Sequence, residues 1–101
     1  MINCGLEQKE LEIIKSVFKK NSKLKSVKIF GSRAKGNYRP NSDIDLALIG
    51  DLDLLEAEKI SSELDDLPLP YLFDVKVFNQ ITTTELLDHI NRVGVFIYDS
   101  K

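Results

Sequence analysis

Two aspartates one residue apart, Asp43 and Asp45, stand at the head of an apolar run that ends at Ile49. If this run is a β-strand, alternate side chains share a face, so both carboxylates point to one side while Ile44 and Leu46 point into a core. Two carboxylates on one face repel each other unless a divalent cation joins them. Mg²⁺ suits such a pair because it prefers oxygen ligands. The pair therefore predicts a magnesium site, and solvated acids at a strand edge are the alternative.

A glycine and a serine, Gly31 and Ser32, follow directly after another apolar run. Glycine lets the backbone approach a phosphate, and serine can cap a following helical turn whose free N–H groups face an anion. The pair predicts a phosphate-binding turn, although neither the P-loop pattern nor the dinucleotide-binding glycine motif is present. Whether the next basic residues, Arg33 and Lys35, contact phosphate or form a solvated turn is left open.

A third acid, Asp74, lies inside a strongly apolar segment, residues 71–78. Strict alternation places Asp74 and Lys76 on the same face of a strand, opposite an apolar face. We expect Asp74 to reach the aspartate pair from a neighbouring strand and to orient or deprotonate an acceptor hydroxyl. An ion pair between Asp74 and Lys76 is the alternative.

Helices and strands alternate along the chain, as the period of the apolar residues indicates. The expected strands cover residues 26–30, 43 or 44 to 49, 71–78 and 95–98. The expected helices cover residues 6–20, 54–67 and the segment between the threonines at 82–84 and Gly94, with one helical turn at residues 32–36. His89 lies beside the apolar stripe of the last helix. We expect it to be packed or half exposed, because no histidine or cysteine stands at a metal-ligand spacing from it.

The composition predicts one globular domain over residues 1–101, since 43% of the residues are hydrophobic and 30% are charged. The net charge of −2 argues against strong nucleic-acid binding, which needs an excess of basic residues. No apolar run approaches the roughly 18 residues of a membrane span, and the N-terminus lacks the features of a secretion signal. The single cysteine, Cys4, fits a reducing compartment. We therefore expect a cytoplasmic protein with no membrane partner.

The motifs together resemble the DNA polymerase β-type nucleotidyltransferase superfamily. The resemblance rests on Gly31-Ser32, then ten residues, then Asp43-x-Asp45, and a third acid in a later hydrophobic strand. The length and the run Gly-Ser-Arg-Ala-Lys-Gly through Ser-Asp-Ile-Asp-Leu are more narrowly similar to the minimal nucleotidyltransferases. This resemblance implies an α/β (α+β) nucleotidyltransferase core. Its small mixed β-sheet would have helices packed mainly on one face and a metal site at an edge.

The resemblance also implies a role for each site residue. Gly31 and Ser32 would hold the triphosphate of ATP, and Asp43 and Asp45 would bind two Mg²⁺ ions. Asp74 would bind the ion nearest the acceptor and help to activate its hydroxyl. The three aspartates would thus be the catalytic residues of an in-line attack on the α-phosphorus, with pyrophosphate leaving.

The acceptor follows from the resemblance alone. We expect no separate acceptor-binding domain, and minimal nucleotidyltransferases usually act with a helical HEPN protein, often a ribonuclease toxin. The resemblance implies an antitoxin that transfers AMP from ATP to a tyrosine hydroxyl of that toxin. Two alternatives stay open: a binding module that neutralises its partner by occlusion, and an enzyme that modifies a small molecule.

Overall fold

The computed structural model describes residues 4–100. The helices are α1 (Gln8–Phe18), α2 (Ser32–Lys35), α3 (Leu54–Asp65) and α4 (Thr84–Val93), and the strands are β1 (Leu24–Phe30), β2 (Ile44–Gly50), β3 (Phe73–Val77) and β4 (Val95–Asp99). A short 3-10 helix, Phe78–Gln80, follows β3. Within residues 4–100, no helix has the length and apolar character needed to cross a membrane.

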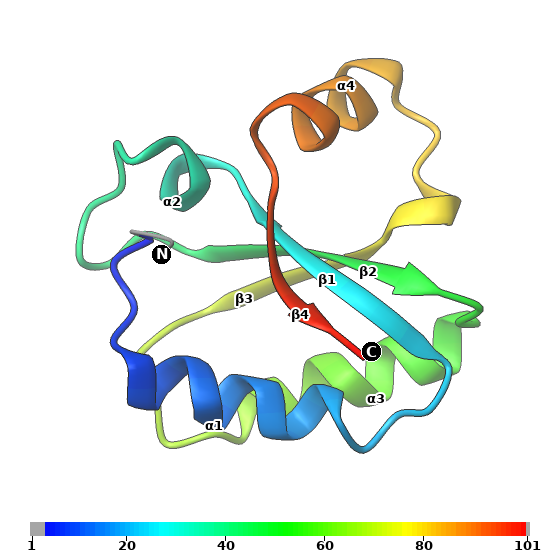
Figure 1. The fold of residues 1–101 in the computed structure, drawn as a ribbon, viewed down its shortest axis with the longest axis horizontal. Helices are drawn as coiled ribbons and strands as arrows, with labels where there is room; N and C mark the ends of the chain where they lie inside the picture. Colours follow the sequence, from blue (N-terminus) through cyan, green and yellow to red (C-terminus); the bar gives the residue numbers. More distant parts are fainter. Residues whose placement is uncertain (1–3, 101) are drawn as a thin grey trace.

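The strands form one mixed sheet in the order β3-β2-β1-β4. β1 is antiparallel to both β2 and β4, whereas β2 and β3 are parallel. A parallel pair needs a crossover connection, and α3 supplies it. Figure 1 shows α1 and α3 together on one side of the sheet, with α2 and α4 on the other side. The expected mixed sheet is confirmed, and the two longest helices share one face.

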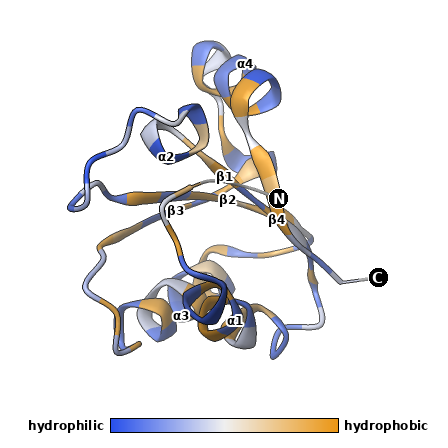
Figure 2. Ribbon diagram, turned by 60° about the vertical axis from the view of Figure 1, so that its left-hand side comes forward, coloured by the Kyte–Doolittle hydropathy of each residue, from blue (hydrophilic) through white to orange (hydrophobic). Residues whose placement is uncertain are grey.

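The main core lies between the sheet and the helices α1 and α3. Alternation in β2 places Ile44, Leu46 and Leu48 in this core, where they are fully buried. Ala47 points to the opposite face and packs in a second, smaller apolar cluster with Phe30 and Ile90. Figure 2 shows hydrophobic residues concentrated in the strands and hydrophilic residues in the loop that follows α2. The two faces of the sheet therefore belong to two separate apolar clusters.

Reciprocal capping sets the starts of the two long helices. The Asp53 carboxylate accepts a hydrogen bond from the Glu56 N–H at 2.8 Å, and the Glu56 carboxylate accepts one from the Asp53 N–H at 3.0 Å. Glu7 and Glu10 form the same kind of capping box before α1. Helix α1 consequently begins two residues later than the pattern of apolar residues predicted.

The remaining boundaries differ from expectation by at most two residues. β1 starts at Leu24, two residues earlier than predicted, and α3 ends at Asp65 rather than at residue 67. Thr83 is the N-cap of α4 as expected, but its side chain makes no capping hydrogen bond. Gly94 follows α4 with extended backbone angles (φ −64°, ψ 142°), because the chain turns directly into β4.

Candidate active site

The parallel pairing of β2 with β3 brings two of the predicted acids side by side. Asp45 on β2 is the direct register partner of Asp74 on β3. Asp43 lies two residues before Asp45, just outside β2. Asp43 and Asp74 are exposed, whereas Asp45 is partly buried. The three acids expected to act together thus occupy one side of the sheet at the start of β2 and β3.

The environment of Asp45 disfavours its charge. Burial is the largest cause that raises the pKa of this carboxyl above its ordinary value, and the negative charges of Asp74 and Asp43 raise it further. The positive charge of Lys76 lowers the pKa of Asp45, as does that of His89 when it is protonated, but the two do not cancel the rise. A cation placed among these carboxylates would relieve the unfavourable charge.

Gly31 lies directly beside Asp45. The residue before it, Phe30, is the register partner of Asp45 in the β1–β2 pairing. Gly31 has φ 75° and ψ −152°, a conformation that is essentially restricted to glycine. A Cβ atom at this position would meet the Asp45 Oδ2 atom at 2.3 Å. Only glycine therefore fits between the end of β1 and the central acid.

The turn after Gly31 is a short helix, as expected, but its cap is different from the predicted one. Gly31 is the N-cap of α2, and Ser32 is the first helical residue, so the serine does not cap the helix. The Lys35 N–H donates to the Gly31 carbonyl at 3.1 Å. The N–H groups of the first turn of any helix have no intrahelical acceptor. In α2 these groups lie next to Gly31, and hence next to the acids.

His89 of α4 also reaches this turn, which the sequence pattern did not reveal. Its Nε2 atom accepts a hydrogen bond from the Gly31 N–H at 3.1 Å. Its ring lies edge-on to the Phe30 ring, with the centroids 6.0 Å apart. The prediction of a packed or half-exposed histidine is confirmed, since His89 is partly buried. The available signal was its spacing of three residues from Leu86, which places it on the face of α4 that packs on the sheet.

Arg33 is the buried charged residue of the described chain, with 1% of its surface exposed. Its guanidinium packs against two tyrosine rings and donates to three backbone carbonyls. The ring centroids of Tyr38 and Tyr71 lie 5.2 and 5.0 Å away, and the carbonyl acceptors belong to Cys4 (3.0 Å), Ser42 (3.0 and 3.2 Å) and Pro40 (3.4 Å). Both interpretations offered for Arg33, a phosphate contact and a solvated turn, are therefore wrong. Lys35 is exposed.

The arginine fixes the loop that leads to the acids. Arg33 follows the Gly31–Ser32 turn directly, and its acceptor Ser42 directly precedes Asp43. The guanidinium thus links the Gly31–Ser32 turn to the segment that begins at Asp43. A buried charge that has its donors satisfied in this way rigidifies its surroundings.

The carboxylates suit a hard divalent cation, although their side chains are not gathered around one point. The donor set is all oxygen and carries excess negative charge, which is what Mg²⁺ prefers. Asp74 Oδ1 lies 3.6 Å from Lys76 Nζ, so the ion pair considered as the alternative is present. Across residues 4–100, no three acidic, histidine or cysteine side chains lie close enough together to hold an ion as they stand.

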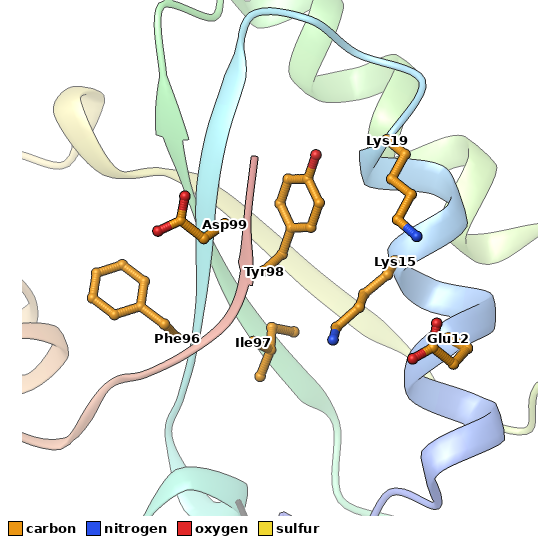
Figure 3. Close-up of a pocket in the computed structure, with 7 residues that line it drawn as sticks. All are labelled: Glu12, Lys15, Lys19, Phe96, Ile97, Tyr98 and Asp99. Atoms are coloured by element: carbon orange, nitrogen blue, oxygen red, sulfur yellow. The ribbon is translucent and has the colours of Figure 1, made fainter. Parts of the chain in front are cut away.

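A separate hollow lies at the other side of the molecule. Figure 3 shows it between α1 and β4, and its volume is about 390 Å³. Lys15, Lys19 and Phe96 are among the residues that line it. β4 is at the opposite end of the strand order from β3, so this hollow contains none of the three acids.

Comparison with known proteins gives a family match and a relative of assigned activity. Residues 12–101 match the family described as polymerase beta, nucleotidyltransferase. A Haemophilus influenzae protein named "Probable protein adenylyltransferase MntA" is 30% identical over 99 residues, which cover 95% of this chain and 85% of that protein.

Two solved structures share the fold. A crystal structure of a toxin–antitoxin with AMP-PNP has a TM-score of 0.74 and 23% sequence identity, and the match covers 90% of this chain and 74% of that chain. A complex of a tri-AMPylated Shewanella oneidensis HEPN toxin with an MNT antitoxin has a TM-score of 0.54 and 21% identity, over 91% of this chain and 68% of that chain.

Proposed function

Because the chain belongs to the polymerase beta family of nucleotidyltransferases, we propose that it transfers AMP from ATP to a tyrosine hydroxyl of a HEPN toxin and thereby acts as the antitoxin. The observation that carries the proposal is the position of Asp45, which lies against Gly31 on one side and beside Asp74 on the other. The adenylyltransferase relative supports the AMP group, and the structures with AMP-PNP and with an AMPylated HEPN toxin support the donor and the partner.

The triphosphate of ATP is assigned to the Gly31–Ser32 turn. The first-turn N–H groups of α2 are free to meet phosphate oxygens, and the glycine leaves no side chain in the way. The turn begins next to Asp45, so a triphosphate held there lies close to that acid. Ser32 and Gly31 therefore serve as the nucleotide-binding residues of the proposal.

Asp43, Asp45 and Asp74 would hold the two Mg²⁺ ions that the family uses. Their all-oxygen chemistry and mutual repulsion fit this role, and the raised pKa of Asp45 reflects burial first and that repulsion second. When bound, the ions would neutralise charge on the attacking and leaving oxygens.

Asp74 is the acid best placed for the acceptor. It is exposed and lies on β3, which is an edge strand of the sheet. In the transfer, the acceptor oxygen forms a bond to the α-phosphorus, the bond from that phosphorus to the bridging oxygen breaks, and pyrophosphate leaves. Asp74 orients the hydroxyl and takes its proton, as a positioned carboxylate can do.

The test is transfer of label from α-labelled ATP, with Mg²⁺, to a purified HEPN protein encoded beside this chain. We expect label on a tyrosine of that protein, and we expect Asp45→Asn and Asp74→Asn to lower the transfer rate by roughly 100-fold or more. Asp65→Asn is the matched control, because Asp65 is an exposed acid at the end of α3, away from the site.

The alternatives correspond to distinct results. If the HEPN protein is silenced while no label moves, the chain is a binding module that acts by occlusion. If label passes to a metabolite when the HEPN protein is absent, the enzyme modifies a small molecule. Equal rates for Asp45→Asn and Asp65→Asn would remove the three acids from the mechanism.

A further inference from the structure

His89 is a titratable side chain that contacts the Gly31–Ser32 turn and has no part in the mechanism above. It comes from α4, 58 residues further along the chain than Gly31. Its Nε2 atom accepts the Gly31 N–H at 3.1 Å, and this hydrogen bond is partly buried. The contact joins the last helix to the turn that the proposal assigns to the triphosphate.

The helix that carries His89 is held firmly on the sheet. Ile90, the next residue, is fully buried and packs with Phe30 and Ala47 in the smaller apolar cluster. The His89 ring itself lies edge-on to Phe30. Since Phe30 directly precedes Gly31, the same few contacts position both partners of the hydrogen bond.

Gly31 needs such a partner. Glycine adopts its backbone angles without strain, but a residue without a Cβ atom also has many other allowed conformations, so its own geometry does not fix this one. An N–H group that is withdrawn from water and left without an acceptor would make this conformation less favourable. His89 supplies the acceptor, and the N–H groups that follow Gly31 remain available for an anion.

We propose that His89 is a positioning residue that holds the Gly31–Ser32 turn in its nucleotide-binding conformation through this hydrogen bond. The assignment of a triphosphate to the turn rests on the proposed function, whereas the hydrogen bond itself does not. Because Nε2 accepts, the ring must be neutral there and carry its proton on Nδ1.

The first test needs neither nucleotide nor partner protein. NMR of the isolated chain should show His89 as the Nδ1–H tautomer, whereas an imidazole without this contact favours the Nε2–H form. The Gly31 amide should exchange with solvent faster in His89→Leu than in the wild type, while the amides of β2 keep their protection. An Nε2–H tautomer, or a Gly31 amide unchanged in His89→Leu, would overturn the proposal.

The second test measures ATP binding to three variants in the presence of Mg²⁺. His89→Leu removes the acceptor, and we expect its Kd for ATP to rise roughly three- to tenfold, the range for one lost hydrogen bond. His89→Gln places an amide oxygen at about the reach of Nε2, and we expect it to restore most of the affinity. Asn91→Leu is the control, since Asn91 is an exposed residue of the same helix.

The results separate the two proposals. Equal affinities of wild type, His89→Leu and Asn91→Leu would overturn the role of His89 and leave the proposed function intact. A His89→Gln variant as weak as His89→Leu would attribute the effect to packing and would also overturn it. If the wild type binds no ATP, the proposed function fails, and the tautomer and the Gly31 amide still decide whether His89 holds the turn.

Discussion

On one side of the Gly31–Ser32 turn, the Arg33 guanidinium is buried with two tyrosine rings and three backbone carbonyls around it. On the other side, the Asp45 carboxylate is partly buried and faces two further acids. The arginine has its interactions satisfied within the chain, whereas the aspartate is left in a site that disfavours its charge. The satisfied charge stabilises the fold, and the unsatisfied one is available for ligand chemistry.

The largest effect on stability should come from the loss of Arg33, whose interactions are satisfied within the chain. Arg33→Met removes the donors of three buried or partly buried carbonyls, so we expect the free energy of unfolding to fall by about 3 kcal/mol, measured by urea denaturation. Arg33→Lys should recover little of this, because a single ammonium group cannot reproduce the planar fork that packs against the two rings. A fall in the free energy of unfolding of less than about 1 kcal/mol would show that Arg33 does not hold the loop in place.

An intermediate effect is expected at Gly31, in the turn between Arg33 and Asp45. Gly31→Ala introduces a Cβ atom at 2.3 Å from Asp45 Oδ2 and places alanine in a region of backbone angles that it disfavours, so we expect a loss of about 2 kcal/mol. Part of this loss should disappear in the background of Asp45→Ala, which removes the clashing oxygen but not the strain. A double-mutant cycle by chemical denaturation measures the coupling, and strict additivity would contradict the contact.

The smallest effect is a gain of stability when the charge of Asp45 is removed. The raised pKa of Asp45 means that the folded state holds the carboxyl proton more tightly than the unfolded state, so stability is lost as the pH rises from the ordinary value of 3.8 through the folded pKa. Asp45→Asn should therefore raise Tm at pH 7 by roughly 2–4 °C while it abolishes transfer. This gain in Tm should vanish at pH values below the ordinary pKa of the Asp45 carboxyl.

Two controls sharpen that prediction. Asp65→Asn, at an exposed position, should leave the difference between neutral and acidic Tm unchanged. Added Mg²⁺ should raise the Tm of the wild type more than that of Asp45→Asn, because binding to the folded state stabilises it. A Tm of Asp45→Asn below that of the wild type at pH 7 would mean that the carboxylate is favourably paired.

Much of the sheet could be predicted because its strands follow a period of two. Alternation alone placed Ile44 and Leu46 in the core with Asp45 opposite, and it put Asp74 and Lys76 on one face. The glycine after β1 could likewise be recognised as a turn that excludes other residues. These features depend on neighbours in the sequence, so a single sequence contains them.

The contacts of Arg33 and His89 could not be predicted in the same way. An arginine after a Gly-Ser pair is ordinarily solvated, and only the folded loop shows that Cys4, Pro40 and Ser42 turn their carbonyls towards it. His89 meets Gly31 because α4 packs on the face of the sheet opposite α1 and α3. Both contacts join segments far apart in the chain or depend on loop geometry, and no local periodicity encodes them.

The parallel register of β2 and β3 limits how the chain can change in length. Asp74 faces Asp45 because the strand that carries it starts at Phe73, and side chains of a strand alternate between faces. Inserting one residue between Phe73 and Asp74 would turn the acid towards the main core and an apolar neighbour away from it. The same change in the loop between α3 and β3, residues 66–72, leaves the strand's internal alternation untouched. Among homologues that keep the activity, differences in length are therefore expected in that loop and not within β3.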